Sequence, residues 1–261
     1  MSSLDKFSLS GKVALITGGA GLYGRQLVRA LSEAGAETYM ASRNLDALKA
    51  LADTLAAEGL RIHPVRFDQG EEASVLALRD HIMERSGHID VLVNNAVARP
   101  MKKGYKDDLE AFAESMRVNA SGLFAVTRAI GDIMAKQGSG SIVNIGSIQG
   151  MIVPDPTIYR GTEMSGWYPD YFFHKGGMIN FTRFAASYYG DKGVRCNCIS
   201  PGGFWTASMP EQFVRQYSDR TFLGRLANET DLMGAVVFLA SDASAYITGV
   251  NLPVDGGYTA K

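Results

Sequence analysis

The amino-acid sequence predicts an α/β fold, a doubly wound parallel sheet of about seven strands with helices on both faces. Three observations predict it. Short apolar runs rich in β-branched residues alternate with stretches of helical periodicity along the chain. The first apolar run ends directly in a cluster of glycines that opens a helix. The 261 residues, 46% of them hydrophobic, suffice for one large core, so we expect a single domain over residues 1–261.

The elements follow in a regular order. Residues 12–17 form the first strand, a helix follows around residues 26–31, and residues 37–41 form the second strand. Asn44 is the predicted N-cap of a helix over residues 45–58, and Asp46 favours its first turn. The later elements are strand 62–66, helix 72–85, strand 91–94, helix 109–134, strand 141–145, helix 169–189, strand 195–199, helix 229–239 and strand 251–254.

The alternation of strands and helices predicts a Rossmann-type arrangement. Right-handed crossovers between parallel strands lay helices on both faces of the sheet. Residues 151–168 and 202–225 lack clear periodicity. Ligands of such sheets bind outside the carboxyl ends of the strands, so these two irregular stretches are candidate substrate walls.

Charge and composition restrict the partners. The 26 basic and 27 acidic residues give a net charge of -1, so we expect a small-molecule partner, no nucleic acid and no membrane. Residues 1–12 lack the apolar core of a secretory signal, and no apolar run could span a bilayer, so a cytoplasmic location is expected. Cys196 and Cys198 are expected as buried free thiols. A redox or metal role is the alternative, but no clustered His or further Cys supplies other ligands, and we predict no metal.

Gly18, Gly21 and Gly24 form the turn between the first strand and the first helix, and Tyr23 lies within it. Glycines let the backbone approach a pyrophosphate closely, and the free N–H groups and positive end of the helix favour its charge. The context predicts a dinucleotide site. The alternative is a tight turn without a ligand.

Tyr171 and Lys175 lie four residues apart, on one face of the predicted helix 169–189. A free phenol titrates near pH 10, and a neighbouring ammonium favours its anion. The pair could therefore supply a general acid or base near neutral pH. The spacing alone is weak evidence, because the chain has 11 tyrosines.

The order of these features resembles the short-chain dehydrogenase/reductase family, from about residue 9 to residue 257. The segment from Thr17 to Gly24 is similar to the T-G-x-x-x-G-x-G motif of its classical members, with Leu22 in place of one glycine. In that family a Ser ends the fifth strand and an Asn lies on the preceding helix. Ser147 and Asn119 match these positions.

The resemblance implies a role for each member of this group. Tyr171 would give or take the substrate proton, and Ser147 would hold the reacting carbonyl or hydroxyl. Lys175 would bind the nicotinamide ribose and lower the pKa of the Tyr171 phenol, and Asn119 would support a water in a proton relay. His174 is expected to pack rather than to catalyse, since the tyrosine already fills the acid–base role.

The end of the second strand indicates the cofactor. Ser42 takes the position where an acidic residue recognises a ribose 2′-hydroxyl, and Arg43 takes the position where the family often contacts a 2′-phosphate. This favours NADP(H) and leaves NAD(H) open, unless Arg43 merely begins a solvated helix. The other cofactor residues that the resemblance implies are Asp68, Asn95, Ala96, Pro201, Gly202 and Thr206.

Ser147 and Tyr171 are 24 positions apart (171 − 147), clearly more than the family commonly shows, so residues 151–170 contain an insertion. We expect it to form a pocket wall for a polyhydroxylated substrate such as a sugar, sugar acid or polyol. An oligomer contact or surface flap is the alternative. The candidate substrate residues are Arg99, Gln149, Arg160, Trp167 and Trp205. Arg99 and Arg160, with Lys102, could bind a carboxylate.

Together these features predict an NAD(P)-dependent oxidoreductase that interconverts a secondary alcohol and a ketone. A catalytically silent dinucleotide-binding regulator is one alternative. An epimerase or dehydratase using transient hydride transfer is another, because the Gly18-x-x-Gly21-x-x-Gly24 spacing resembles the extended branch of the family. The resemblance also implies a homotetramer or homodimer, formed through the long helices that carry Asn119 and Tyr171.

Overall fold

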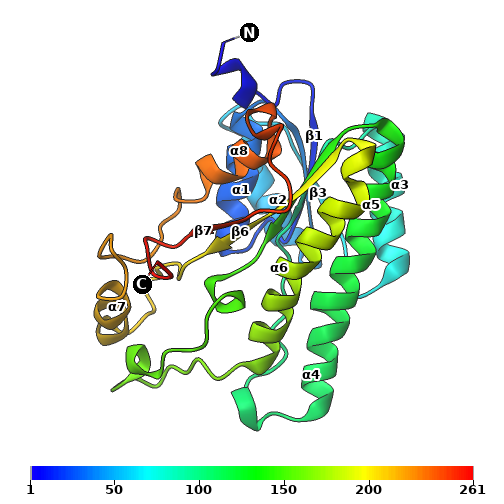
Figure 1. The fold of residues 1–261 in the computed structure, drawn as a ribbon. Helices are drawn as coiled ribbons and strands as arrows, with labels where there is room; N and C mark the ends of the chain where they lie inside the picture. The colour runs from blue at the N-terminus through cyan, green and yellow to red at the C-terminus, as the bar shows by residue number, and fades with distance from the viewer. Residues whose placement is uncertain (1, 261) are drawn as a thin grey trace.

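The computed structural model describes residues 2–260 and confirms the predicted fold class, a parallel sheet of seven strands covered by helices on both faces (Figure 1). The strand order is β3-β2-β1-β4-β5-β6-β7. The strands are β1 (Val13–Thr17), β2 (Glu37–Ser42), β3 (Ile62–Arg66), β4 (Val91–Asn94), β5 (Gly140–Ile145), β6 (Val194–Pro201) and β7 (Asn251–Val254). The helices are α1 (Leu22–Glu33), α2 (Leu45–Ala56), α3 (Glu72–Ser86), α4 (Leu109–Met116), α5 (Leu123–Gln137), α6 (Pro169–Tyr189), α7 (Glu211–Ser218) and α8 (Met233–Ala240).

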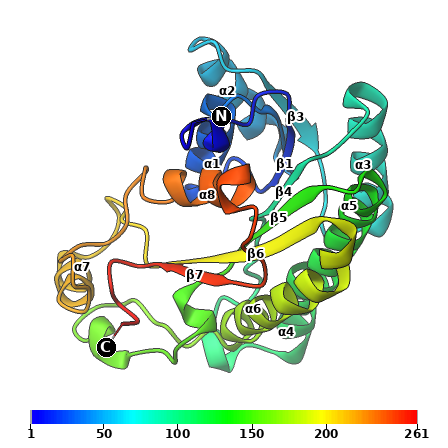
Figure 2. The same cartoon turned by 45° about the horizontal axis from the view of Figure 1, so that its top comes forward.

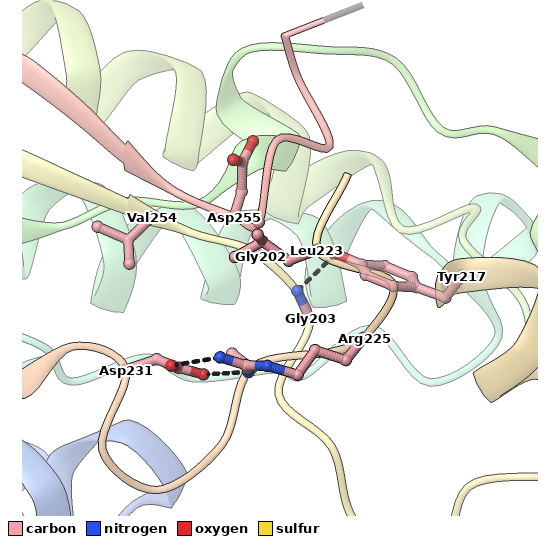
Figure 3. Close-up of a pocket in the computed structure, with 10 residues that line it drawn as sticks. Gly202, Gly203, Tyr217, Leu223, Arg225, Asp231, Val254 and Asp255 are labelled. Atoms are coloured by element: carbon pink, nitrogen blue, oxygen red, sulfur yellow. Dashed lines mark hydrogen bonds and ion pairs between the residues drawn. The ribbon is translucent and has the colours of Figure 1, made fainter. Parts of the chain in front are cut away.

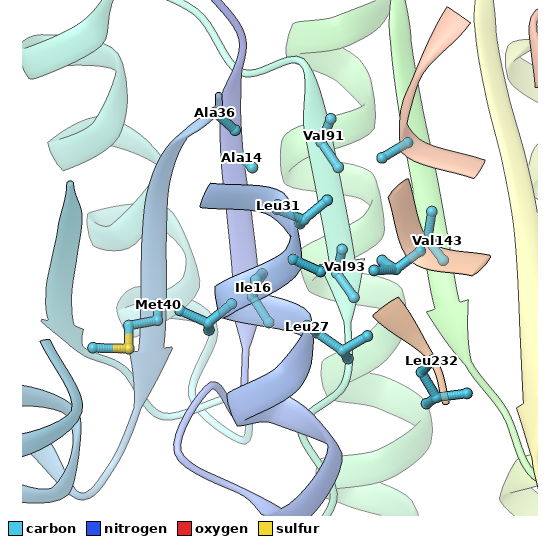
Figure 4. Packing of buried hydrophobic residues seen from close by; sticks show 14 of the residues in the cluster. Ala14, Ile16, Leu27, Leu31, Ala36, Met40, Val91, Val93, Val143 and Leu232 are labelled. Atoms are coloured by element: carbon cyan, nitrogen blue, oxygen red, sulfur yellow. The ribbon is translucent and has the colours of Figure 1, made fainter. Parts of the chain in front are cut away.

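The sheet is buried on both faces because successive side chains of a strand point to opposite sides. On β1, Ala14 and Ile16 belong to the cluster that packs beneath α1, α2 and α8, whereas Val13 and Leu15 belong to the cluster beneath α3, α5 and α6. Figure 2 shows the two helical layers on either side of the sheet. Figure 4 shows the first cluster, in which Leu27 and Leu31 of α1 lie over the strands.

The crevice at the carboxyl end of the sheet lies where the strand order reverses. β1 pairs with β2 on one side and with β4 on the other, so the chain leaves the ends of β1 and β4 in opposite directions. The glycine turn after β1 and the loop after β4 therefore border one crevice.

Several predicted boundaries agree with the structure, including those of β3, β4, α6 and β7. The predicted N-cap is confirmed, because the Asn44 side chain accepts a hydrogen bond from the Ala47 N–H at 3.0 Å. The carboxamide thus supplies a partner for one of the free N–H groups at the start of α2.

The prediction of a helix over residues 109–134 is confirmed, but that helix is not α-helical throughout. A π-helical segment, Arg117–Gly122, separates α4 from α5. Asn119 lies in that segment, and its carboxamide pairs with both main-chain groups of Ala98 in the loop after β4. Apolar periodicity runs through the π-helical segment, so the pattern alone could not show this tertiary contact. Such π segments are frequent at functional sites.

The prediction that residues 202–225 are irregular was wrong, because they contain α7. This helix buries Phe213 and Tyr217 against the segment that follows β5, in a third and smaller core. Its stability depends on a partner distant in the sequence, which local pattern does not reveal.

The last helix begins at Met233 rather than at residue 229. The Asn228 side chain accepts hydrogen bonds from the N–H and the hydroxyl of Thr230, and the Asp231 carboxylate accepts one from the Asn228 N–H. These local bonds compete with a helical turn, so the helix starts after them.

Candidate active site

A cleft of about 830 Å³ opens over the carboxyl ends of β1, β4, β5 and β6. It brings together most of the residues predicted for cofactor and catalysis. Those lining it are Gly18, Gly21, Tyr23, Gly24, Ser42, Asn95, Ala96, Ser147, Tyr171, Lys175, Pro201 and Gly202, with Arg99 and Gln149 from the predicted substrate set.

The glycine turn fits a dinucleotide. A Cβ on Gly24 would overlap the main-chain oxygen of Gly18 and lie 2.8 Å from that of Gly19, so only glycine permits this close turn. The Asn95 side chain donates to the Gly18 oxygen at 2.9 Å and fixes the turn to the loop after β4. No side chain caps the start of α1, so its free N–H groups remain available to an anion.

The Tyr23 side chain, at the start of α1, contacts the segment that follows β6. Its phenol donates to the Gly202 carbonyl at 2.8 Å, and its ring meets Phe204 edge to face at 5.1 Å. The glycine turn and the end of β6 are therefore joined directly at the wall of the cleft.

A small pocket of about 80 Å³ lies behind Gly202 and Gly203 (Figure 3). The Gly203 N–H donates to the Tyr217 hydroxyl at 2.6 Å, and the Arg225 guanidinium pairs with both oxygens of Asp231 at 2.6 and 2.8 Å. The Tyr217 hydroxyl therefore supports the loop after β6 directly.

Tyr171 lies near two cations. The Arg99 guanidinium carbon is 4.2 Å from the centroid of its ring, and the Lys175 ammonium is 5.7 Å from it. The Ser147 and Arg99 side chains both act to lower the pKa of the phenol.

The surroundings of Tyr171 favour its anion. Burial alone raises the pKa of the phenol, but the charges of Lys175 and Arg99 lower it, and the Ser147 side chain adds to this effect. The net pKa lies below the ordinary value of about 10. Tyr171 is therefore suited to exchange a proton with an alcohol or ketone closer to neutral pH than a free phenol.

Lys175 is held in place by the sheet. The residue is 3% exposed, and its ammonium donates to the Ile145 carbonyl at 2.5 Å, at the end of β5. Burial lowers the pKa of this ammonium, whereas the Tyr171 phenolate acts in the opposite direction. The two side chains thus form one electrostatic unit.

Asn119 lies beneath the cleft rather than in its lining. The residue is 2% exposed, and its amide oxygen accepts from the Ala98 N–H at 2.8 Å. Its amide nitrogen donates to the Ala98 oxygen at 2.8 Å and to the Ser115 hydroxyl at 3.0 Å. Both amide hydrogens are therefore taken by the protein.

His174 packs against Tyr171. Its ring meets the Tyr171 ring edge to face at 5.2 Å, and neither ring nitrogen has a hydrogen-bond partner among the described residues. Burial and the nearby cations lower the pKa of this imidazole to about 3. The side chain is neutral at physiological pH, as expected of a packing residue.

Besides Asn119, six predicted residues lie outside the lining. Arg43 and Trp205 are exposed next to lining residues, and Asp68 accepts a hydrogen bond from the Gly70 N–H in its own loop. Thr206 hydrogen bonds to Ser208. The other two, Arg160 and Trp167, are exposed on the inserted segment.

Residues 151–168, here called the flap, form one wall of the cleft together with α7. Figure 2 shows this segment beside α7. Gln212 and Gln216 of α7 donate to the Arg160 carbonyl at 2.9 and 3.0 Å. Tyr159 stacks on Phe213 at 5.5 Å. The main chain of Arg160 therefore connects the flap to α7, while its exposed side chain does not line the cleft.

Sequence reasoning missed part of this wall. It did not predict the lining residues of α7 and of the segment just before it, which are Met209, Phe213 and Tyr217. Phe213 and Tyr217 stand four residues apart, a helical spacing that could have indicated a buried face.

Cys196 and Cys198 are buried free thiols, as predicted, and burial raises the pKa of both. Among residues 2–260, no three His, Cys, Asp or Glu side chains gather where they could hold a metal ion. No helix in this part of the chain is both long and apolar enough to cross a membrane.

Comparison with known proteins agrees with this geometry. The family model described as enoyl-(acyl carrier protein) reductase matches residues 21–259. Gluconate 5-dehydrogenase of Gluconobacter oxydans is 34% identical over 99% of this chain and 99% of that protein. Galactitol 2-dehydrogenase (L-tagatose-forming) of Cereibacter sphaeroides is 33% identical over 97% of each chain.

Among solved structures, a gluconate 5-dehydrogenase from Burkholderia cenocepacia in complex with NADP and tartrate is 33% identical, covers 100% of both chains and superposes with a TM-score of 0.89. The likeness extends over the whole chain in sequence and in structure. The chain belongs to the short-chain dehydrogenase/reductase family and is an NAD(P)-dependent enzyme that interconverts secondary alcohols and ketones.

Proposed function

We propose that the enzyme acts on a polyhydroxylated carboxylate, a sugar acid, with NADP(H) as its favoured cofactor. The observation that carries this proposal is the charge of the cleft. Within the described residues, Arg99 and Lys175 are the only charged side chains that line it, and no carboxylate does. A low-dielectric cleft with two cations favours an anionic substrate over a neutral one.

Four residues share the chemistry in this proposal. Tyr171 takes the hydroxyl proton of the alcohol, or returns it to the ketone. Ser147 orients the reacting oxygen beside that phenol, and Lys175 holds the phenolate and the ribose of the cofactor. When bound, the nicotinamide accepts or supplies the hydride. A water of the proton relay would contact the main chain of Asn119, since its amide hydrogens are already donated within the protein.

Arg99 is the proposed partner of the substrate carboxylate. It lines the cleft on the side of the Tyr171 ring and forms no salt bridge with another described residue, whereas its guanidinium can bind a carboxylate through two hydrogen bonds. The gluconate 5-dehydrogenases among the relatives support this substrate class, and the galactitol 2-dehydrogenase supports a chain of hydroxyl groups.

Replacing Arg99 with glutamine tests this assignment. Because a charge-assisted hydrogen bond contributes about 1.5–3 kcal/mol, kcat/KM for gluconate should fall about tenfold or more relative to kcat/KM for a neutral polyol such as galactitol. The comparison is made within one variant, so a general effect on Tyr171 cancels. Lys102→Gln removes an exposed cation from the same loop, outside the cleft lining, and should leave the ratio unchanged. An unchanged gluconate-to-galactitol ratio in Arg99→Gln would refute the assignment.

The preference for NADP(H) rests on Ser42 and Arg43. Ser42 lines the cleft at the end of β2 and carries no charge that would repel a 2′-phosphate. Arg43, next to it, is exposed and forms no ion pair within residues 2–260, so its guanidinium is available to that phosphate. The NADP in the Burkholderia cenocepacia complex supports the same choice.

The decisive experiment for the proposed function follows absorbance of the reduced nicotinamide with sugar acids, polyols and simple ketones, each with NADP(H) and NAD(H). We expect the highest kcat/KM for a sugar acid with NADP(H). Better turnover of neutral polyols would refute the substrate class, and better turnover with NAD(H) would refute the cofactor preference. Conversion of substrate without net change in the cofactor would favour epimerase chemistry instead.

We also infer a homotetramer or homodimer. Exposed aromatic side chains form a row along α5 and α6, in which Phe184 stacks on Phe181 and on Tyr188, with ring centroids 6.1 Å apart in both pairs. Phe124, Phe184 and Tyr188 are 47%, 60% and 53% exposed, an unusual apolar surface for an isolated chain. A single-chain mass by light scattering would contradict this inference.

A further inference from the structure

A closed chain of contacts links the cleft to the helices beneath it. Asp170 directly precedes Tyr171 and accepts a hydrogen bond from the Ser115 hydroxyl at 2.6 Å. Ser115 in turn accepts from the Asn119 amide, whose carboxamide pairs with Ala98. Ala98 precedes Arg99, which lies over the Tyr171 ring. The contacts therefore begin and end at neighbouring residues of α6.

The side chains of this hydrogen-bond network are fully buried. Ser115, Asn119 and Asp170 are 0%, 2% and 3% exposed, so water cannot readily replace a missing bond. Three different parts of the fold, α4, the π-helical segment and the start of α6, meet there. Loss of one bond would leave a buried polar group without a partner.

The Asp170 carboxylate determines which groups donate and which accept in this hydrogen-bond network. An ionised carboxylate accepts hydrogen bonds and donates none, so Ser115 must donate to Asp170 and keep a lone pair for Asn119. The Asn119 amide nitrogen must then face Ser115, which turns its oxygen toward the Ala98 N–H. A reversed carboxamide would place two donors together at Ala98.

We propose that Ser115 and Asp170 are positioning residues, which orient Asn119 and, through Ala98, hold Arg99 over the ring of Tyr171. This inference rests on the proposed function, because it assigns Arg99 and Tyr171 to the reaction. It adds two residues that touch neither the substrate nor the cofactor.

The pH dependence of alcohol oxidation reports the position of Arg99. The ionisable groups around the Tyr171 phenol are Lys175 and His174 of α6, Arg99 of the loop after β4 and Tyr23 of α1. The imidazole is neutral, so Lys175 and Arg99 supply the positive charge. If Arg99 moves away, the pKa of the phenol rises, and the ascending limb of kcat/KM against pH moves to higher pH.

The test is a double-mutant cycle between Ser115→Ala and Arg99→Gln. We expect Ser115→Ala to move the ascending limb to higher pH and to lower kcat/KM about tenfold at neutral pH. In the Arg99→Gln background, the same substitution should change kcat/KM less than about twofold, because the group it positions is gone. A full tenfold decrease in kcat/KM in that background would overturn the proposal. So would an ascending limb for Ser115→Ala that coincides with the ascending limb of the wild type.

Two further variants keep the test decisive. Asp170→Asn retains an acceptor oxygen but no longer forbids a reversed hydrogen bond, so a smaller shift in the same direction is expected, and it replaces Ser115→Ala if that variant does not fold. Ser32→Ala is the matched control, since the buried Ser32 hydroxyl donates to the Thr38 hydroxyl at 2.9 Å, far from the cleft. The ascending limb of its pH profile should not move. The cycle uses whichever alcohol the wild type oxidises. If the pH profile of the variants does not move, only the positioning role is refuted. If the wild type turns over no alcohol, the proposed function itself is refuted.

Discussion

Tyr171→Phe is expected to lower kcat by about 10² to 10⁴-fold, the range that a positioned general acid or base contributes. The substitution removes the phenol oxygen and keeps the ring that packs against His174 and beneath Arg99. Ser147 would still face the reacting oxygen, but the phenol of lowered pKa that exchanges its proton would be gone. Turnover of the preferred substrate with NADP(H), followed by nicotinamide absorbance, measures the loss.

The same variant should still bind the cofactor. The glycine turn between β1 and α1 keeps its geometry, so the Kd for NADPH, measured by fluorescence, should change less than about threefold. Tyr246→Phe is the control, because Tyr246 is a fully exposed tyrosine outside the cleft lining. A kcat for Tyr171→Phe within tenfold of the wild type would exclude Tyr171 as the acid–base group.

Gly24→Ala is expected to weaken NADPH binding by about 100-fold or more and to lower the free energy of unfolding by about 1–3 kcal/mol. The new Cβ would overlap the Gly18 oxygen and approach the Gly19 carbonyl, both of them main-chain atoms that cannot turn aside as a side chain would. The turn would have to open, which moves the free N–H groups of α1 away from the pyrophosphate. Fluorescence titration and chemical denaturation measure the two effects.

The control for this variant is Gly234→Ala. Gly234 lies on α8, where an added Cβ meets no atom within 4 Å. Alanine is the better helix former by about 1 kcal/mol, so the control should bind NADPH normally and unfold at the same or a slightly higher denaturant concentration. NADPH binding by Gly24→Ala equal to that of the control would show that the turn does not hold the dinucleotide.

The parts of the site that the sequence predicted best are those attached to strand ends. The turn at Gly18, the pair Asn95 and Ala96, and Ser147 all follow buried strands, whose register in a parallel sheet places their ends along one edge. Periodicity fixes such strands, so their following residues can be located without a structure. The helical pair Tyr171 and Lys175 was equally predictable, since i and i+4 share a face.

The parts that could not be predicted depend on contacts between distant segments. Arg160 and Trp167 were expected at the substrate but are exposed outside the cleft lining, and the main chain at Arg160 is held by side chains of α7. The π-helical segment at Asn119 has the same origin, a pairing with Ala98 that lies 21 residues away. Asp170 stands beside Tyr171 in the sequence, yet its partner Ser115 is 55 residues away, so its burial could not be inferred.

The contacts between the flap and α7 have a consequence for changing the specificity of this enzyme. Besides the two glutamines on the Arg160 carbonyl, Arg220, which follows α7, pairs with Asp155 at 3.3 Å and donates to Thr157 at 2.6 Å. A chimera that received a new flap alone would bring foreign residues against these side chains and lose the wall as a whole. The two stretches form one module for protein engineering, to be exchanged together although about 40 residues of helix and strand separate them.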